Sequence, residues 1–469
     1  MQTTTARSKV AGRRPRMATV KVVEGEDTVV PVAGVVLWGA LLDRLDLGGV
    51  ADERQLRAIG PQGYSGGACY RTLTETMLAG GDFVSDRFLL ADVATAELRG
   101  GHQLPSVPTL TRFLAEAGLG AVSKAAAVNR EMLRRAWAMG AGPGPGLLTI
   151  DIDPTLVPTY GLTKEGTTFS YTGQVGLAPM LGVLAETGDV LAVRARGPRA
   201  GMRGVASFLD ECVQAIPAEV RATRQLWFRA DSQAFSLAMV RAARRHDACF
   251  TVTARQVPNV VARITELQGD PSTTWLPAID SDDEVAETTI VFGAGARRKD
   301  RGPDLSTAGV TLRLIVRRQR VGIGHQLSFD DLDGYRFQAV MTNIPPVLAS
   351  AAQVEHHHRL RGGGPEEVIR QLKGDFGFAH APVKGFFGNW LWWCASVLAY
   401  NVARWLRTLV LPAAFRRCRG KRLRICFLNV AARVVHSGRQ LRLRLPRAYP
   451  YAKDFVAAIE RIRSLPRVC

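Results

Sequence analysis

The sequence predicts an α/β protein that begins with a helical region. Apolar residues recur at helical spacing through residues 33–139, and a glycine- and proline-rich stretch follows at residues 140–146. Beyond that stretch, short apolar strands alternate with helical segments, which is typical of an α/β sheet. The 469 residues leave room for about two to four domains and a large core.

The region before the glycine-rich stretch divides into two parts. Residues 1–25 are expected to form a disordered arm, because residues 1–21 carry six Lys or Arg and no acid. Residues 26–139 predict a helical domain, in which Ser106 and Thr109 are candidate helix caps. The segment PTLTRFLAEAG is compatible with a helix-turn-helix DNA reader, although such short helices occur in any α domain.

The first part of an α/β core is predicted at residues 140–255. Three apolar segments in quick succession are expected to be consecutive strands: LLTIDID, VGLAPMLGVLA and DVLAVRARG. A helix at 203–217, the strand RQLWFRAD, a helix in SQAFSLAMVRAARRH and the strand CFTVTAR continue the alternation. The glycine-rich stretch before them is interpreted as a linker.

Residues 256–330 predict a β-rich insertion, because strand-like runs are separated there by acidic turns such as DSDDE. The second part of the core is predicted at residues 331–412, from the strand YRFQAVMTN to a long helical region that starts near Pro365. A basic C-terminal region is predicted at residues 413–469.

One segment, FFGNWLWWCASVLAYNVARWL at residues 386–406, is apolar enough to raise the question of a membrane span. It contains Asn389, Asn401 and Arg404, which are costly in lipid. We therefore predict a buried amphipathic helix and no membrane partner.

The net charge of +19 is concentrated at the two ends of the chain. Residues 401–469 carry seventeen Lys or Arg against two acids, whereas the residues between the two ends hold 38 bases and 40 acids. Basic ends on a nearly neutral body predict contact with a polyanion, most simply the phosphates of DNA or RNA. A solubilising surface is the other interpretation. A strand through RQLRLRLPR would turn Arg442 and Arg444 to one face, toward phosphates, and its leucines to the other.

The seven cysteines lie scattered, without a CxxC pair, and their number is odd. This pattern argues against a disulfide framework or a zinc site and favours a reducing, cytoplasmic setting. The N-terminal residues contain no apolar stretch of the kind found in secretory signals.

Two of the predicted strands end in aspartates. Asp153 ends one and Asp231 ends another, and the carboxyl edge of a sheet is where α/β proteins usually bind ligands. Strand alternation puts Asp151 on the same face as Asp153, so spacing alone does not choose between them. A third acid, Glu366, lies in the first turn of a predicted helix.

Arg370 and Lys373 follow Glu366 by four and seven residues, on the same helical face. A carboxylate with two cations along one face could bind a metal at one end and a phosphate beyond it. Taken alone, this pattern is more typical of a salt-bridged surface helix. Together with two strand-end aspartates it indicates a metal- and phosphate-binding site.

These motifs resemble the DDE transposases of bacterial insertion sequences, in particular the cut-and-paste group with the pattern Tyr-x2-Arg-x3-Glu-x6-Lys. Within that group the sequence is most similar to the insertion-sequence family numbered thirteen-eighty. The resemblance runs from about residue 30 to about residue 450 and is carried by four stretches: IDIDPT, FRADSQAFS, AVMTN and EEVIRQLKGDF.

The resemblance implies an RNase H-like catalytic core with the β-rich insertion between Asp231 and Glu366. It implies that Asp153, which precedes a small residue and a threonine, Asp231 and Glu366 are the catalytic and metal-binding acids. Glu366 has the required spacing to Lys373, but four residues lie between Arg361 and Glu366, where the pattern has three. His358 stands where the family has tyrosine, and the GGGP stretch is expected to absorb the extra residue as a bulged loop.

Two Mg²⁺ ions per active site are expected, with Mn²⁺ able to substitute, because cutting a phosphodiester needs an activated oxygen and a stabilised leaving oxygen. Asp153 would bridge both ions, Asp231 would hold one and Glu366 the other. Arg361, Arg370 and Lys373 are expected to contact the DNA backbone. The EHHHR stretch is interpreted as a solvated loop or a phosphate contact rather than a metal site.

The resulting hypothesis is a transposase that binds the terminal inverted repeats of its element, cleaves both ends and joins them to target DNA. It is expected to work as a homodimer in the synaptic complex, in the cytoplasm of a bacterium and on the nucleoid. Two alternatives remain open: a catalytically silent DNA-binding protein derived from a transposase, and a metal-dependent nuclease that does not join strands.

Overall fold

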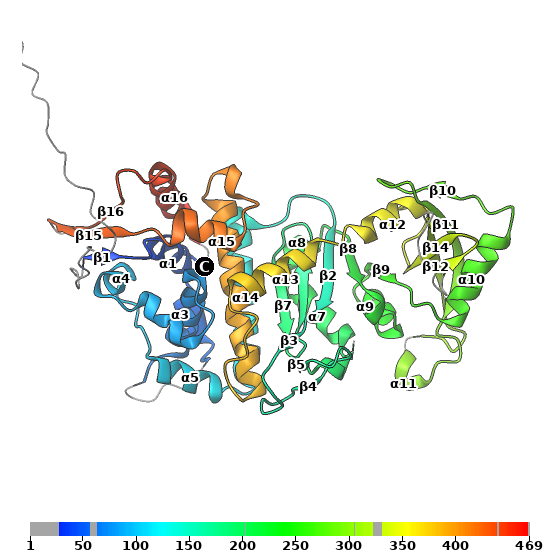
Figure 1. Ribbon diagram of the computed structural model, residues 1–469, viewed down its shortest axis with the longest axis horizontal. Coiled ribbons are helices and arrows are strands. Elements are labelled where there is room, and N and C mark those ends of the chain that lie inside the picture. The colour runs from blue at the N-terminus through cyan, green and yellow to red at the C-terminus, as the bar shows by residue number, and fades with distance from the viewer. Residues whose placement is uncertain are drawn as a thin grey trace, which may run out of the picture.

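The structure is a computed structural model with helices at one end and a large sheet through the rest of the molecule (Figure 1). Helix α14 (Phe386–Leu409) lies between these two parts. The described residues are 28–56, 63–201, 203–303, 305–321, 331–438 and 440–467. The basic arm predicted at residues 1–25 lies outside them.

Helices occupy most of the N-terminal region. They are α1 (Val35–Arg44), α2 (Leu47–Glu53), α3 (Gly66–Ala79), α4 (Val93–Leu98), α5 (Val107–Ala115) and α6 (Leu119–Ala136). Ser106 caps α5, because its side chain accepts a hydrogen bond from the amide of Thr109 at 3.4 Å. Thr109, the other candidate cap, lies inside the helix.

The main sheet has ten strands in the order β10-β11-β12-β14-β9-β8-β2-β6-β7, with β13 paired to β14. In chain order they are β2 (Leu148–Pro154), β6 (Met180–Leu184), β7 (Val190–Arg194), β8 (Leu226–Ala230), β9 (Cys249–Thr253), β10 (Leu276–Pro277), β11 (Glu284–Phe292), β12 (Val310–Arg320), β13 (Asp331–Leu332) and β14 (Tyr335–Thr342). Strands β2, β8 and β9 are parallel to one another, and β6 and β14 pair antiparallel on either side of them. Strands β11 and β12, from the segment expected to be an insertion, therefore extend this same sheet.

The expectation of a single strand at residues 175–185 is wrong. That segment forms two strands in different sheets, β5 (Val175–Leu177) and β6. Strand β5 pairs with β3 (Val157–Pro158) and β4 (Thr168–Phe169) in a separate three-stranded sheet. Pro179 lies between the two strands, and a proline has no amide hydrogen with which to continue a ladder.

The two faces of the main sheet differ in polarity. Ile152 pairs with Gly182, and a Cβ at Gly182 would meet Cys212 of helix α7 (Val205–Ala215), so this apolar face packs on α7. The opposite face carries Asp151 and Arg229 and lies under helices α12 (Ala351–Arg359) and α13 (Gly364–Asp375), which cross it in Figure 1. The acids that strand alternation places together are thus covered by these two helices.

The EHHHR stretch lies in helix α12, so the prediction of a solvated loop there is wrong. A capping box between Ser350 and Gln353 starts this helix. A further helix, α10 (Pro258–Gly269), lies in the segment expected to be β-rich and begins with a proline in its first turn. Helices α8 (Ala218–Arg221), α9 (Leu237–Arg245) and α11 (Arg298–Arg301) complete this part of the chain.

Helix α14 is buried on nearly all sides, rather than on one face as predicted. Its polar groups are paired: Asn401 hydrogen-bonds both the amide and the carbonyl of Val190 on the edge strand β7, and Trp390 donates to Val193 of the same strand. Among the described residues, no helix is long and apolar enough to cross a membrane.

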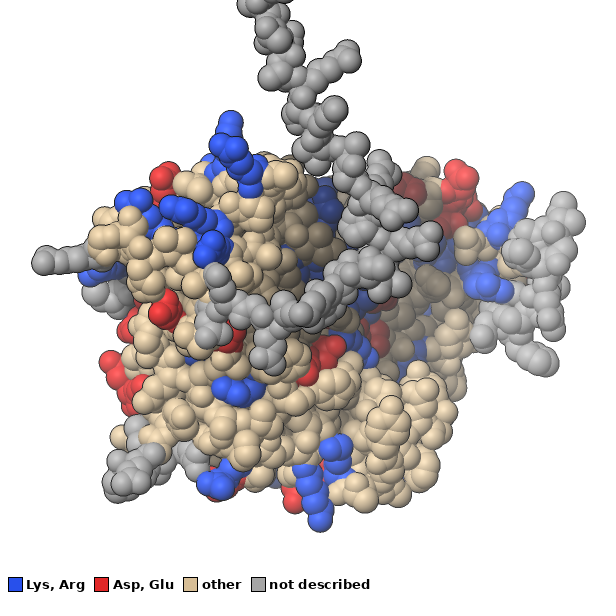
Figure 2. Space-filling view, turned by 60° about the vertical axis from the view of Figure 1, so that its left-hand side comes forward, with Lys and Arg blue, Asp and Glu red and all other residues tan. Residues whose placement is uncertain are grey.

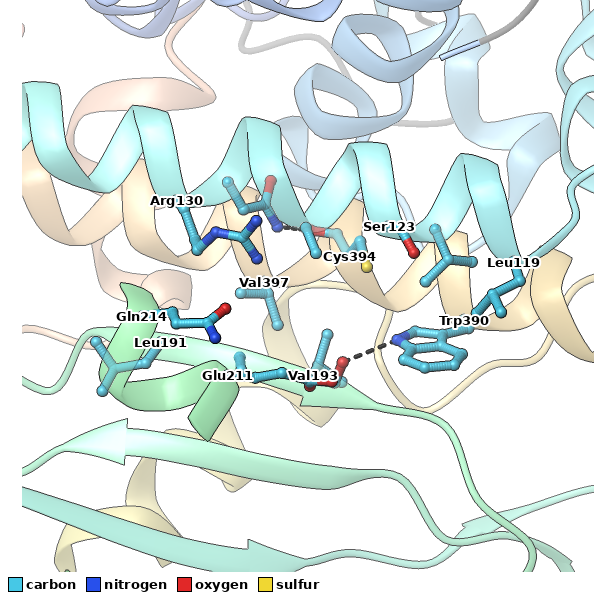
Figure 3. A pocket seen from close by; sticks show the side chains of 14 residues that line it. Leu119, Ser123, Arg130, Leu191, Val193, Glu211, Gln214, Trp390, Cys394 and Val397 are labelled. Carbon is cyan, nitrogen blue, oxygen red and sulfur yellow. Dashed lines mark hydrogen bonds between the residues drawn. The ribbon is translucent and has the colours of Figure 1, made fainter. Parts of the chain in front are cut away.

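Asp189, in the turn before β7, connects the helical region to the sheet. Its fully buried carboxylate accepts hydrogen bonds from Trp137 at 2.8 Å, from Trp405 at 3.0 Å and from Arg404 at 2.6 Å. A cavity of about 290 Å³ remains in the same joint, between α6, β7 and α14 (Figure 3). Asp189 therefore joins the two regions through buried hydrogen bonds, and a partly polar cavity lies in the same interface.

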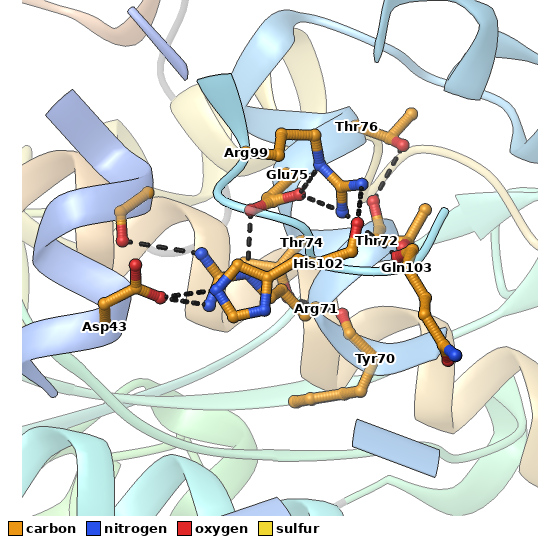
Figure 4. A network of polar contacts seen from close by, with 11 residues as sticks. Asp43, Tyr70, Arg71, Thr72, Thr74, Glu75, Thr76, Arg99, His102 and Gln103 are labelled. Atoms are coloured by element: carbon orange, nitrogen blue, oxygen red, sulfur yellow. Dashed lines mark hydrogen bonds and ion pairs between the residues drawn. The ribbon is translucent and has the colours of Figure 1, made fainter. Parts of the chain in front are cut away.

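A second buried carboxylate organises the N-terminal helices. Glu75 of α3 pairs with Arg71 at 2.9 Å and with Arg99 at 2.7 Å, and all three side chains are almost completely buried (Figure 4). Arg71 and His102 both reach Asp43 of α1 at the open side of this network. A buried carboxylate flanked by two guanidinium groups meets the requirement that buried charges be paired.

The C-terminal residues form a small sheet on the helical region. Strand β15 (Ala432–Ser437) pairs with β1 (Val29–Val30) and with β16 (Gln440–Arg444), and helices α15 (Gly420–Leu423) and α16 (Ala452–Ser464) flank it. Arg442 and Arg444 are exposed, whereas Leu443 and Leu445 are partly buried and pack on the core. Leu441 was expected on the buried side but is 42% exposed.

Candidate active site

Asp153 lies at the carboxyl end of β2, on the face covered by α12 and α13. Its side chain is 19% exposed and pairs with Arg361 at 2.8 Å. Burial raises the pKa of Asp153 to about 6; Arg361 opposes this shift, and the nearby carboxylates of Asp231 and Glu366 add to it. The three predicted acids are thus close enough to interact electrostatically.

Asp151, two residues earlier on the same face, has a different environment. It is fully buried and forms a two-pronged ion pair with Arg229 of β8, at 2.7 and 2.8 Å. Arg229 also donates to the carbonyl of His357. Because both of its oxygens are bonded to a buried guanidinium, Asp151 fixes α12 to the sheet and is not available to a ligand.

Asp231 follows the last residue of β8, and β8 is the parallel neighbour of β2. Its carboxylate accepts a hydrogen bond from the amide of Gln233 at 2.9 Å, which fixes its orientation at the start of a short helical turn. Glu366 is exposed in the first turn of α13. Two carboxylates are therefore held by the sheet edge, and the third is presented by a helix above it.

The break between α12 and α13 brings Arg361 to Asp153. Residues 361–363 form a turn, and Gly363 at its end has a φ of 103°, which only glycine adopts at little cost. The GGGP stretch expected to form a bulged loop is divided: Gly362 and Gly363 lie in this turn, whereas Gly364 and Pro365 begin α13. The Nε of Arg361 is buried and has no hydrogen-bond partner within the described part of the chain.

The other two predicted basic residues of α13 differ from each other. Lys373 donates to the carbonyl of Leu156 at 2.6 Å, and burial lowers its pKa while the nearby Asp153 raises it. Arg370 is 61% exposed and pairs with Glu367 at 2.9 Å. Lys373 is therefore part of the wall beside Asp153, whereas Arg370 lies on the outer surface.

His358, at the position of the family's tyrosine, bridges two hydroxyl groups of β9. Its two ring nitrogens lie 2.9 Å from Thr251 and 2.9 Å from Thr253. Burial lowers its pKa to about 3, and the neighbouring cations Arg361 and Arg229 add to this effect. His358 is thus a neutral packing residue.

The oxygen ligands of the site suit magnesium better than zinc. Within the described ranges, no three His, Cys, Asp or Glu side chains are arranged as a metal cluster. Magnesium does not need such a cage, because it binds proteins through one or two carboxylates and keeps its other ligands from water and phosphate. Asp153 and Asp231 supply hard oxygens. Burial raises the pKa of Asp153, repulsion from Asp231 adds to this shift, and a divalent cation would relieve that repulsion.

Two features of the site were missed from the sequence. Arg229 lies two residues before Asp231 in FRAD, so strand alternation could have placed it on the same face. The three-stranded sheet directly after Asp153 had no comparable signal, because its strands are only two or three residues long.

Basic side chains are distributed over the face viewed from the helical end of the molecule. Figure 2 shows a group of them near the upper left edge of that face, with acidic side chains between the others. The exposed arginines of the C-terminal sheet, Arg442 and Arg444, belong to the helical end and not to the catalytic edge.

Comparison with known proteins places the chain in a family. The model of the family described as transposase DDE domain, group 1, matches residues 76–467. No curated protein matches the sequence significantly. Solved structures that match include a piggyBac transposase synaptic complex with hairpin DNA, at 10% identity and a TM-score of 0.38, over 79% of this chain and 74% of that one. The match to the family model covers most of the chain, so the protein belongs to the transposase DDE domain group 1 family and is a DNA transposase.

Proposed function

We propose that this transposase cleaves DNA at the ends of a bacterial insertion sequence of the family numbered thirteen-eighty and joins the freed ends to target DNA. Asp153, Asp231 and Glu366 are assigned as the catalytic carboxylates of an RNase H-like core. The observation that carries the proposal is that Asp153 and Asp231 lie at the ends of two adjacent parallel strands, with Glu366 on the helix beside them. Burial raises the pKa of Asp153 to about 6, and the carboxylates of Asp231 and Glu366 add to this shift.

In this proposal Asp153, Asp231 and Glu366 would hold the two Mg²⁺ ions, or Mn²⁺ in their place. When bound, the ions supply an activated oxygen nucleophile and stabilise the leaving oxygen of the phosphodiester. Asp231 is pre-oriented by the amide of Gln233, and Asp151 with Arg229 keeps the end of β2 in register with β8. The chain's part in the chemistry is to fix these oxygens before DNA arrives.

Arg361 and Lys373 are assigned to the scissile phosphate region. Arg361 has a free, buried Nε–H beside Asp153, and a phosphate oxygen is a suitable acceptor for it. Lys373 brings a positive charge to the same wall. Arg370, Arg442 and Arg444 are exposed and are assigned to more distant backbone phosphates, which fix the position of the duplex but carry no sequence information.

Sequence-specific binding of the terminal inverted repeats is assigned to the N-terminal helices, where α5 and α6 follow one another after a short turn. The working unit is proposed to be a homodimer that holds both element ends, on the nucleoid in the bacterial cytoplasm.

The test is cleavage of a duplex that carries the element's terminal repeat, with and without Mg²⁺. Asp153→Asn and Asp231→Asn should abolish Mg²⁺-dependent cleavage and leave repeat binding and folding largely intact, because a charge is lost without a change in volume. Asp280→Asn, at an aspartate that is 77% exposed, is the matched control. Retention of near-normal cleavage by Asp153→Asn together with its loss in Asp151→Asn would show that the wrong acid has been assigned.

A precleaved end with a free 3′-hydroxyl separates the transposase from the two alternatives. Joining of this end to a plasmid is the expected result. Cleavage without joining would indicate a nuclease, and binding with neither reaction would indicate a catalytically silent protein.

A further inference from the structure

The three-stranded sheet that follows Asp153 projects from the catalytic edge; we name residues 156–178 the flap. It contains β3, β4 and β5, with β5 in the middle. Its first residue, Leu156, accepts the hydrogen bond of Lys373, so the flap starts three residues from the candidate catalytic acid.

The base of the flap is fixed to the body of the protein. Leu177 is fully buried, and the amide of Thr155 donates to the carbonyl of Pro179 at 2.9 Å. On the far side, the carboxylate of Glu165 accepts from the amide of Phe386 at 2.9 Å, and Lys164 donates to the carbonyl of Val383 at 3.2 Å. The base therefore holds its position relative to the catalytic edge and α14.

The tip of the flap carries two exposed tyrosines. The amide of Ser170 donates to the carbonyl of Gln174, which closes the β4–β5 turn around Tyr171. On the other side of β5, the amide of Thr159 donates to the carbonyl of Val175, so Tyr160 extends to the same end of the sheet. Tyr160 is 102% exposed and Tyr171 is 96% exposed.

Further apolar and basic groups are exposed on the flap and on the loop that bonds to it. Leu162 and Phe169 of the flap are 55% and 46% exposed. Arg199 donates to the carbonyl of Phe169 at 3.3 Å and is itself exposed, and Arg203 is exposed in the same loop. Exposed aromatic rings with guanidinium groups beside them are the combination by which proteins bind unpaired nucleotides.

We propose that the tip of the flap is a stacking platform for unpaired bases of the substrate DNA. The inference rests on the proposed function, because it places the platform next to the DNA held at Asp153. Tyr160 follows Asp153 by seven positions, and at up to about 3.6 Å per residue this limits the distance between their backbones to roughly 25 Å, or about seven nucleotide steps. The bases contacted should therefore lie within that distance of the cleaved phosphate.

The choice of nucleic acid over a second protein copy rests on position and charge. The flap is continuous with the candidate catalytic edge, and the exposed arginines of the neighbouring loop, Arg199 and Arg203, are basic. Stacking of a tyrosine ring on a base removes two apolar faces from water. Because every base has a flat π face, this contact requires no particular sequence.

The experiment compares two substrates in Ca²⁺, so that binding is measured apart from cleavage. One is a blunt duplex that ends in the terminal repeat, and the other has six unpaired nucleotides at the same end, with 2-aminopurine among them. Tyr160→Ala combined with Tyr171→Ala should weaken binding of the second substrate by roughly 5- to 150-fold and abolish the fluorescence quenching of its 2-aminopurine. Binding of the blunt duplex should not change.

Two further variants distinguish stacking from general damage. Replacing both tyrosines with phenylalanine should preserve affinity and quenching, whereas replacing both with leucine should lose them, because leucine is apolar but has no π face. Phe88→Ala, at an aromatic residue of the helical region that is 65% exposed, is the control and should have no effect.

The proposal would be overturned if the double alanine variant bound both substrates equally more weakly, or if its affinity for the unpaired substrate were unchanged. A change in sedimentation of the DNA-free protein in that variant would also overturn it and would assign the tip to a second copy of the chain. The Asp153→Asn variant separates the two proposals: it should still quench 2-aminopurine while failing to cleave. Cleavage by Asp153→Asn with quenching still dependent on the tyrosines would reject the catalytic assignment and leave the platform standing.

Discussion

At the scale of single residues, burial separates two aspartates that the sequence places on one face. Asp151 is fully buried and satisfied by Arg229, whereas Asp153 is partly exposed and pairs with Arg361. The carboxylate of Asp151 thus stabilises the fold, whereas that of Asp153 faces the candidate site. This difference predicts opposite effects on stability and activity.

Asp151→Asn should lower the free energy of unfolding by about 3–5 kcal/mol, because it leaves the buried Arg229 guanidinium without a counter-charge. Asp153→Asn should change it by less than about 1 kcal/mol, since its carboxylate is partly solvated and is repelled by nearby acids. Urea unfolding of both variants at neutral pH measures the difference. Equal losses would contradict the structural role assigned to Asp151.

His358 predicts a pH dependence of stability. Its pKa is about 3 in the folded protein, below the ordinary value of 6.5, so the unfolded chain binds a proton that the folded protein does not. The contribution of His358 to the free energy of unfolding is therefore fully present above pH 6.5. It is lost as the pH falls from about 6.5 toward about 3, by up to about 1.4 kcal/mol per pH unit.

His358→Gln should be less stable at pH 7.5, because a hydrogen bond to Thr251 or Thr253 is lost, but its stability should fall less steeply between pH 7 and pH 5. Unfolding midpoints across this range provide the measurement. His436→Gln, at a histidine whose side chain is 70% exposed, is the control and should retain the wild-type slope.

At the scale of secondary-structure elements, one position tests the role of a strand in DNA binding and another tests the packing of two helices. The first is β16, where Arg442 and Arg444 are exposed and the neighbouring Leu443 is partly buried. Replacing both arginines with glutamine should weaken binding to all DNA sequences alike and reduce the log–log salt slope by about one unit for each lost phosphate contact.

Binding isotherms at several salt concentrations, on the terminal repeat and on unrelated DNA, measure both effects. The paired control is Arg263→Gln, at an exposed arginine of α10 that is bonded to Glu266. An unchanged slope would show that this charge is only solubilising, and selective loss of repeat binding would transfer sequence reading from the N-terminal helices to this sheet.

The second position is Gly388, near the start of α14. A Cβ there would lie 2.2 Å from the carbonyl oxygen of Leu114 in α5, so Gly388→Ala should push the two helices apart and cost roughly 1–3 kcal/mol of unfolding free energy. Gly120→Ala in α6 meets nothing within 4 Å and should instead stabilise by up to about 1 kcal/mol. Thermal unfolding of both variants checks the contrast, and a neutral Gly388→Ala would mean that α5 and α14 pack less closely than described.

At the scale of the whole molecule, the helical region and the sheet share one continuous core, and Asp189 bonds to both. Asp189→Asn should lower the free energy of unfolding by about 3–5 kcal/mol, because Arg404 loses its buried counter-charge. Circular dichroism and tryptophan fluorescence should report the same shifted midpoint if the two regions unfold together.

Asp282→Asn, at an exposed aspartate in the turn before β11, is the matched control and should unfold as the wild type does. Separate transitions for the two probes in Asp189→Asn, with a single one in the wild type, would show that this carboxylate joins regions that otherwise unfold independently.

The sequence by itself determined what depends on local pattern. Strand ends indicated Asp151, Asp153 and Asp231 as candidate acids, and the first turn of a helix indicated Glu366, because these signals come from residues a few positions apart. The resemblance to DDE transposases, and not the alternation, favoured Asp153 over Asp151. The alternation of strands and helices likewise indicated the α/β class.

Only the tertiary structure decided what depends on distant partners. Arg229, 78 residues away, makes Asp151 structural, and helices from several regions bury α14 on nearly all sides. The split of residues 175–185 between two sheets and the flap beside Asp153 also arose there, since two- and three-residue strands are specified by the strands they pair with. A short sequence pattern does not show which distant segment will cover a given side chain and remove it from water. That burial distinguishes a structural carboxylate from one that faces a ligand.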